Sequence, residues 1–245
     1  MRENGISIFA AARTSETKGG LFDHRMFALE NTSANPLDGE WVEKGQVKTK
    51  WESFALDATS FEHKGVRYYV WAQKDPNIPG NSNLYISEME NAWTLKGEQA
   101  CIATPEYDWE KIGFLVNEGA AVLKRNGRIF ISFSASATDF NYCMGLLTAD
   151  ENSDLLDPNS WVKNPEPVFS TSEKTGQYGP GHNSFTVTED GLHDVLVYHG
   201  RNYKEIEGDP LYDPNRHTRV QLIQWNDDGT PNFGVPVPDS KVTTK

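Results

Sequence analysis

Short runs of β-branched and aromatic residues, separated by Gly, Asn, Asp and Pro, set the hydrophobic pattern of this chain. The clearest runs are VRYYVWA at 66–72, GRIFISFSAS at 127–136, DVLVYHG at 194–200 and RVQLIQW at 219–225. No segment sustains the 3.6-residue period of an amphipathic helix. Runs of this length and composition are typical of β-strands, so the pattern predicts an all-β fold: a sandwich, a barrel or a propeller.

An internal repeat favours the propeller. Residues 56–72, 116–135 and 180–200 each run from a polar residue through a strand and a glycine turn into an aromatic strand. Further strand-like segments with a tryptophan lie between them. A repeat that holds a hairpin and two more strands resembles a propeller blade of four strands. We therefore expect residues 1–245 to form a single β-propeller domain.

The polar residue that opens each repeat is ionisable. These residues are Asp57, Glu118 and His182, spaced by 61 and 64 residues, and they precede their turn glycines by 8, 9 and 9 residues. The innermost strand of every propeller blade lines the central axis. The three side chains are therefore predicted to meet in one axial site, although each residue taken alone could simply cap a hairpin.

Composition excludes several classes of partner. The 245 residues carry a formal net charge of −12 and no basic run, which argues against nucleic acid as a partner. No apolar stretch approaches the roughly 18 residues of a membrane-spanning helix. The two cysteines, Cys101 and Cys143, have no metal-ligand spacing, and we interpret them as small buried side chains.

Several segments together resemble glycoside hydrolase family 43, particularly its α-L-arabinofuranosidases. They are NEGAAVLKRNG, FALDAT, YGPGHNSF, NYCMG, DPLYDPNRHTR and WNDDGTPNFGVPV, and the resemblance covers roughly residues 24–236. It implies a five-bladed propeller. It also implies hydrolysis, with inversion, of arabinofuranosyl or xylopyranosyl linkages in plant polysaccharides and oligosaccharides.

The resemblance assigns roles to particular residues. Glu118 takes the position of the general acid, and Asp57 that of the second carboxylate, which tunes the acid and orients the sugar. His182 matches a histidine near a bound calcium or other ion, and is expected to contact that ion or the substrate. Arg219 matches an arginine that binds a carboxylate or a sugar hydroxyl. Ala120 departs from the family pattern, which has proline there.

The general base is the missing element. In the family it is an Asp near the start of the first blade, and inversion needs it about 6.5–9.5 Å from the acid. Gly5 resembles the turn glycine of a hairpin whose first strand would precede Met1. The chain is therefore expected to lack the first blade and part of the second, and the resulting open blade edge to favour self-association. Asp23 and Asp38 do not fit the repeat, and we interpret them as loop or turn residues.

Aromatic residues are candidates for binding the sugar. Trp71 could stack on a sugar ring, and Phe114 and Tyr142 are expected to flank the acid and shape its subsite. His199 and Tyr198 could also line the site, but a histidine near a strand end is more often a hydrogen-bonded structural residue. We therefore favour the structural interpretation for both.

Two functional hypotheses of different class follow. The first is a glycosidase that removes terminal α-L-arabinofuranosyl residues, with a β-xylosidase as the alternative within enzymes. The second is an inactive remnant that binds pentosyl groups without hydrolysing them, because it lacks the base. No organic cofactor is expected. The compartment depends on the N-terminus: an intact homologue would be secreted or periplasmic, and a chain complete at Met1 would be cytoplasmic.

Overall fold

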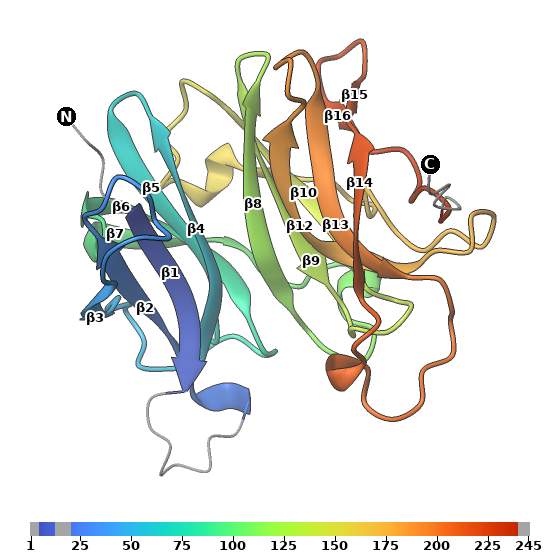
Figure 1. Cartoon of the computed structure of the whole chain (residues 1–245), viewed down its shortest axis with the longest axis horizontal. Helices are drawn as coiled ribbons and strands as arrows, with labels where there is room; N and C mark the ends of the chain where they lie inside the picture. Colours follow the sequence, from blue (N-terminus) through green and yellow to red (C-terminus); the bar gives the residue numbers. More distant parts are fainter. Residues whose placement is uncertain (1–4, 13–20, 240–245) are drawn as a thin grey trace. The chain divides into compact units, whose positions relative to one another are not determined.

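The computed structural model describes residues 5–12 and 21–239, and the chain divides into two compact units (Figure 1). One unit comprises Met1–Thr104 and Asp154–Ser160, and the other comprises Pro105–Ser153 and Trp161–Lys245. Strands dominate both units, which confirms the predicted all-β class. The helices of the described residues are short 3₁₀ turns: η1 (Leu21–Asp23), η2 (Asp108–Glu110), η3 (Pro158–Ser160) and η4 (Pro210–Tyr212).

The first unit holds two antiparallel sheets, ordered β1-β2-β3 and β4-β5-β6-β7. Their strands are β1 (Gly5–Ala12), β2 (His24–Asn31), β3 (Val42–Gln46), β4 (Ala55–His63), β5 (Val66–Gln73), β6 (Asn83–Asn91) and β7 (Thr94–Ala103). Side chains of both sheets, including Met26 on β2 and Trp71 on β5, form one hydrophobic core. A four-stranded sheet in which sequential strands are neighbours, such as β4-β5-β6-β7, is the form of a propeller blade.

The second unit holds sheets ordered β11-β10-β9-β8, β12-β13-β14 and β15-β16. Their strands are β8 (Asn117–Arg125), β9 (Arg128–Ala135), β10 (Cys143–Asp150), β11 (Val162–Lys163), β12 (Tyr178–Val187), β13 (Asp194–Arg201), β14 (His217–Leu222), β15 (Gln224–Trp225) and β16 (Pro231–Asn232). Phe130 on β9, Met144 on β10 and Tyr198 on β13 belong to its core.

The four strands predicted from the clearest hydrophobic runs are present. They form β5, β9 and β13, and the last run is divided between β14 and β15. The division falls at Ile223, whose backbone N–H donates a 2.9 Å hydrogen bond to the carbonyl of Asp194, and whose side chain is buried.

The three repeated hairpins are also confirmed, as β4–β5, β8–β9 and β12–β13. The first two close through two-residue turns, Lys64–Gly65 and Asn126–Gly127, in which every φ lies between 50° and 78°. Positive φ at both positions is typical of the type I′ turn, which is why a glycine follows Lys or Asn there. The third turn is longer and contains Gly191.

Each hairpin carries a β-bulge near the start of its first strand. In each bulge two residues lie opposite one aromatic residue of the second strand: Trp71, Phe133 or Tyr198. The bulge residues with positive φ are Asp57, Gly119 and His182, at 53°, 62° and 46°. Glu118 therefore precedes the structural equivalent of Asp57 and His182 by one residue. The expectation that all three residues occupy the same point of the repeat is therefore wrong, because Glu118 is displaced by one residue. Glu118 and His182 lie equally far from their turn glycines only because the third turn is longer.

The sheet that begins with Gly5 has three strands in sequential order, β1-β2-β3. Among residues 5–12 and 21–239, β1 pairs only with β2, so β1 lies at a sheet edge. Three expectations stay predictions: that strands are missing before β1, that the propeller has five blades, and that the chain is a single domain.

Candidate active site

The candidate acid, Glu118, is the second residue of β8 and lies directly before the bulge in that strand. Glu118 pairs with Ser134, and the ladder resumes two residues after the bulge begins, at Ala121. The first of the two residues between, Gly119, has φ of 62°, a conformation that side-chain-bearing residues rarely adopt. The sequence NEGA therefore turns the backbone sharply just after the acid, and the Glu118 side chain is half-buried.

A buried tyrosine orients the Glu118 carboxyl group. The hydroxyl of Tyr142 donates a 2.8 Å hydrogen bond to Oε1 of Glu118, and the Tyr142 side chain is only 1% exposed. Tyr142 directly precedes β10. The bond holds Oε1 of Glu118 against the Tyr142 hydroxyl, so the orientation of the carboxyl group is fixed.

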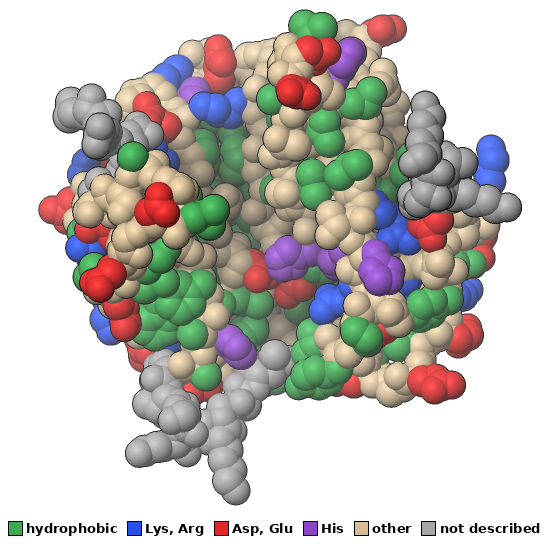
Figure 2. All heavy atoms as spheres, viewed as in Figure 1, with side chains coloured by type: hydrophobic (Ala, Val, Ile, Leu, Met, Phe, Trp, Pro, Cys, Tyr) green, Lys and Arg blue, Asp and Glu red, His purple; other side chains and the backbone are tan. Residues whose placement is uncertain are grey.

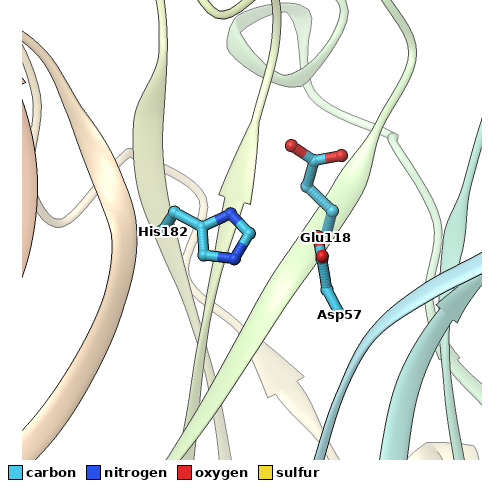
Figure 3. A group of neighbouring side chains, drawn as sticks. All are labelled: Asp57, Glu118 and His182. Carbon is cyan, nitrogen blue, oxygen red and sulfur yellow. The ribbon is translucent and has the colours of Figure 1, made fainter. Parts of the chain in front are cut away.

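The candidate histidine, His182, occupies the bulge of β12. Its φ is 46°, and its backbone N–H donates a 2.7 Å hydrogen bond to Oγ of Ser134 on β9. A Cβ atom on Gly119 would lie 3.3 Å from Nδ1 of His182, so the ring packs closely over that glycine. An imidazole nitrogen of His182 and a carboxylate oxygen of Glu118 lie within 4.8 Å of each other, and Figure 3 shows the two side chains next to each other.

A buried ion pair supports the start of β8. The carboxylate of Glu110 in η2 is fully buried and accepts hydrogen bonds from Nζ of Lys163 at 3.0 and 3.2 Å. It also accepts a 3.0 Å bond from Nδ2 of Asn117, the residue directly before Glu118. Because a buried charge must be paired and hydrogen-bonded, this group holds the backbone beside the acid in one position.

Asp57 belongs to the first unit. It occupies the bulge of β4 with φ of 53°, opposite Trp71 of β5, and its side chain is half-buried. A non-glycine residue in this conformation is strained, and such strain concentrates at functional sites. Asp57 and His182 share this feature in separate sheets. The predicted role of Asp57 as second carboxylate stays a prediction.

The expectation that Trp71 stacks on a sugar is wrong. Its indole is completely buried between the rings of Tyr69 and Tyr85, and its Nε1 donates a 2.8 Å hydrogen bond to Gln73. A ring enclosed in this way belongs to the core, because no face of it is open to a ligand. Trp71 lies on the same face of β5 as Tyr69, two residues away, and both side chains belong to one core cluster.

The other predicted binding residues lie in the second unit. Phe114 is 53% exposed, in the segment that leads into β8, and its predicted contact with substrate stays a prediction. Arg219 on β14 donates to Oδ1 of Asp239 at 2.8 Å, and its predicted part in binding substrate stays a prediction. It also donates to the carbonyl of Gly200 at 2.6 Å. Tyr142 contacts Glu118 as described, and its part in shaping a subsite stays a prediction.

The structure corrects the interpretation of His199. Its imidazole stacks on the ring of Tyr142, with 5.5 Å between ring centroids and an angle of 10° between the planes. Neither of its ring nitrogens has a hydrogen-bond partner in the described structure, so it is not the hydrogen-bonded structural residue that we expected. No motif signalled this contact, because Tyr142 and His199 lie in different blades of the repeat.

Charged side chains are scattered over the molecule. On the visible face, acidic groups are interspersed with basic ones (Figure 2). Within the described residues, no helix is long and apolar enough to cross a membrane.

Antiparallel sheets of sequential strands, repeated along the chain, are the blades of a β-propeller protein. The family model described as "Glycosyl hydrolases family 43" matches residues 8–231, and the chain belongs to this family. The resemblance found in its motifs is thereby confirmed.

Relatives of known name agree. The chain is 58% identical over 221 residues to "Alpha-L-arabinofuranosidase 43" of Humicola insolens. The matched residues make up 90% of this chain and 46% of that protein. It is 55% identical over 231 residues to "Extracellular exo-alpha-(1->5)-L-arabinofuranosidase" of Streptomyces avermitilis, covering 94% of this chain and 47% of that protein. The chain thus spans about half the length of these curated relatives.

A solved structure supports the same fold. The crystal structure of an α-L-arabinofuranosidase from Lactobacillus brevis is 57% identical, with a TM-score of 0.92 over 97% of this chain and 74% of that one. The predicted propeller class is confirmed by this likeness.

Proposed function

We propose that this chain carries the acid side of an α-L-arabinofuranosidase site. Its substrates would be terminal α-L-arabinofuranosyl residues of arabinose-containing plant polysaccharides or oligosaccharides. The names of its relatives support the substrate class. The relative from Streptomyces avermitilis is also named extracellular, which supports action outside the cell.

The observation that carries the proposal is the Glu118 carboxyl group with its buried Tyr142 donor. A general acid must present a proton to the departing glycosidic oxygen in a fixed direction, and the bond to Oε1 fixes the orientation of the carboxyl group. Glu118 is half-buried, which suits a group that must be neutral at rest and still reach a ligand.

The remaining chemical roles complete the proposal. Asp57 is the second carboxylate, whose charge favours the protonated form of the acid. Hydrolysis proceeds with inversion, so a general base activates water on the opposite face of the sugar. Neither Asp23, in η1, nor Asp38, in a turn, lies on a first strand of the repeat, and we assign the base to neither.

An ion beside His182 is part of the proposal. Calcium takes six to eight oxygen ligands, whereas the second unit offers one imidazole nitrogen and one carboxylate oxygen here. This donor set is not a calcium cage, so an ion here would be held by water, with the His182 imidazole hydrogen-bonded to a ligand water and Glu118 left as the acid. The ion would supply local positive charge, and the proton transfer remains with Glu118. Loss of thermal stability on chelation, restored by added calcium, would support this arrangement.

The test is hydrolysis of p-nitrophenyl α-L-arabinofuranoside and p-nitrophenyl β-D-xylopyranoside. We expect faster turnover of the arabinoside, and a fall in kcat of about 10² to 10⁴-fold for Glu118→Gln on a natural disaccharide whose leaving group needs protonation. The matched control is Glu189→Gln, an exposed carboxyl in the turn at the far end of the β12–β13 hairpin, which should keep wild-type activity. A fall below tenfold for Glu118→Gln would remove Glu118 from the role of acid.

The same assay decides between the alternatives. Preferred hydrolysis of the xyloside would indicate a β-xylosidase. Absence of turnover on both substrates, with arabinose binding retained in calorimetry, would indicate a binding protein. Proton NMR of the first-formed sugar tests inversion directly, because an inverting enzyme releases the β-anomer from an α-arabinoside.

A further inference from the structure

His199 lies on β13, the middle strand of the sheet β12-β13-β14. It is paired with Gly181 of β12 on one side and with Thr218 of β14 on the other. Its ring is nearly parallel to that of Tyr142, at 5.5 Å and 10°. Offset stacking of this kind is the preferred geometry of flat rings and holds the plane of each.

A second contact fixes the position of the Tyr142 ring. A Cβ atom on Gly181 would lie 2.6 Å from Cε1 of Tyr142, so the ring rests directly on the glycine backbone. Gly181 is the register partner of His199, and the two residues therefore form adjoining parts of one surface. Tyr142 thus has little freedom to tilt or to slide while His199 is in place.

The environment of His199 keeps its ring uncharged. Burial, and then the positive charges of Arg216, His182, Arg201 and Arg219, lower the pKa of His199 to about 3. Both ring nitrogens are buried without a hydrogen-bond partner among the described residues. At neutral pH the side chain is therefore a neutral flat ring. Its ring contacts Tyr142 by stacking, and this environment does not favour a role in proton transfer.

We infer that His199 is a positioning residue for the acid: its imidazole stacks on Tyr142 and thereby holds the Tyr142 hydroxyl on Oε1 of Glu118. The sequence of contacts is short, since His199 touches Tyr142 and Tyr142 donates to Glu118 at 2.8 Å. This inference rests on the proposed role of Glu118 for its effect on activity. The geometric part, that His199 holds Tyr142, is independent of any activity.

The test compares His199→Ala with His199→Phe. Alanine removes the stacked ring, so kcat should fall about tenfold to a hundredfold with KM within about threefold, because the acid is misplaced and not the bound sugar. Phenylalanine replaces one flat ring by another, and should restore most of the lost kcat. Equal loss of kcat in both variants would overturn the inference, since stacking would then not be the property that matters.

A readout without activity separates this inference from the proposed function. In crystal structures, the distance from the Tyr142 hydroxyl to Oε1 of Glu118 should exceed hydrogen-bond length in His199→Ala and remain near 2.8 Å in His199→Phe. An unchanged bond in His199→Ala would overturn the inference even if the chain hydrolyses arabinosides. Failure to hydrolyse any pentoside would remove the proposed function and leave this structural test intact.

Leu196→Ala is the matched control for stability. Leu196 lies on the same strand, is fully buried and belongs to the hydrophobic core. Its truncation should lower the melting temperature at least as much as His199→Ala, and should leave kcat of the folded protein unchanged. A comparable loss of kcat in Leu196→Ala would show that destabilisation alone explains the effect of His199→Ala.

Discussion

The hydroxyl of Tyr142 donates a 2.8 Å hydrogen bond to Oε1 of Glu118, and this bond joins the segment before β10 to the bulge of β8. Tyr142→Phe keeps the ring and removes the donor. Glu118 becomes charged as it gives up its proton, and a hydrogen bond to a charged group contributes about 1.5–3 kcal/mol, so we expect kcat to fall about tenfold or more with little change in KM. Steady-state kinetics on the arabinoside measure both.

Tyr178→Phe is the control for this substitution. Its hydroxyl makes a bond of the same length to Glu173, in an exposed position on the same unit. Activity should be unaffected there. Equal losses in the two variants would show that the Tyr142 hydroxyl has no special relation to the acid.

The close approach of Gly181 to Tyr142 gives a prediction for stability. An added Cβ would stand 2.6 Å from the Tyr142 ring, so Gly181→Ala forces the ring or the strand to move. Overpacking of this kind costs about 1–3 kcal/mol of unfolding free energy, measurable by denaturant titration. Gly200→Ala is the matched substitution, because the nearest atom there is 3.7 Å away and a methyl group fits. Similar losses at both glycines would contradict the steric argument.

Loss of either member of the buried pair of Glu110 and Lys163 should destabilise the second unit strongly. Glu110→Gln leaves the Lys163 ammonium buried without its counter-charge, which costs about 3–5 kcal/mol. Chemical denaturation measures the loss, and Glu110→Gln combined with Lys163→Met should recover part of it. The exposed pair Lys204–Glu173 is the comparison: Glu173→Gln should cost about 1 kcal/mol or less. A small effect of Glu110→Gln would mean that water reaches the pair.

Acid sensitivity is predicted for the ion pair of Arg201 and Asp213. Burial alone would raise the pKa of Asp213, but the hydrogen bonds that this carboxylate accepts and the charge of Arg201 outweigh burial and lower the pKa below its ordinary value. A lowered folded-state pKa means that the stabilisation is complete above the unfolded pKa, near about 4, and is lost as the pH falls through the folded pKa.

Asp213→Asn tests this behaviour. The variant should lose more than about 1 kcal/mol of unfolding free energy at pH 7 and show a shallower loss of stability below about pH 4 than the wild type. Thermal unfolding across pH 2–7 would measure both, with the exposed Asp227→Asn as control. Parallel pH profiles of wild type and Asp213→Asn would exclude this carboxyl as a source of acid sensitivity.

Much of the fold was predictable from local pattern. Short runs of β-branched and aromatic residues predicted β5, β9 and β13 within a residue or two, because such residues favour strands. Turn glycines such as Gly127 predicted the hairpins, because a positive φ in the turn selects glycine. The candidate acid and histidine were found from motif and repeat spacing, and the structure brings Glu118 and His182 together.

Other features were not predictable from spacing. Trp71 looked like a sugar-stacking ring, yet it is enclosed in the core, on the same face of β5 as the buried Tyr69. The offset of Glu118 by one residue was hidden because the longer third turn gave Glu118 and His182 the same count to their turn glycines.

What the sequence by itself determined is the strand content, the positions of the hairpin turns and the residues that give the family its motifs, since all of these depend on neighbours along the chain. Only the tertiary structure decided that Tyr142 donates to Glu118 and that His199 stacks on Tyr142. These contacts join residues 24 and 57 positions apart. Nothing local in the chain encodes them, because they form only when separate strands pack against one another.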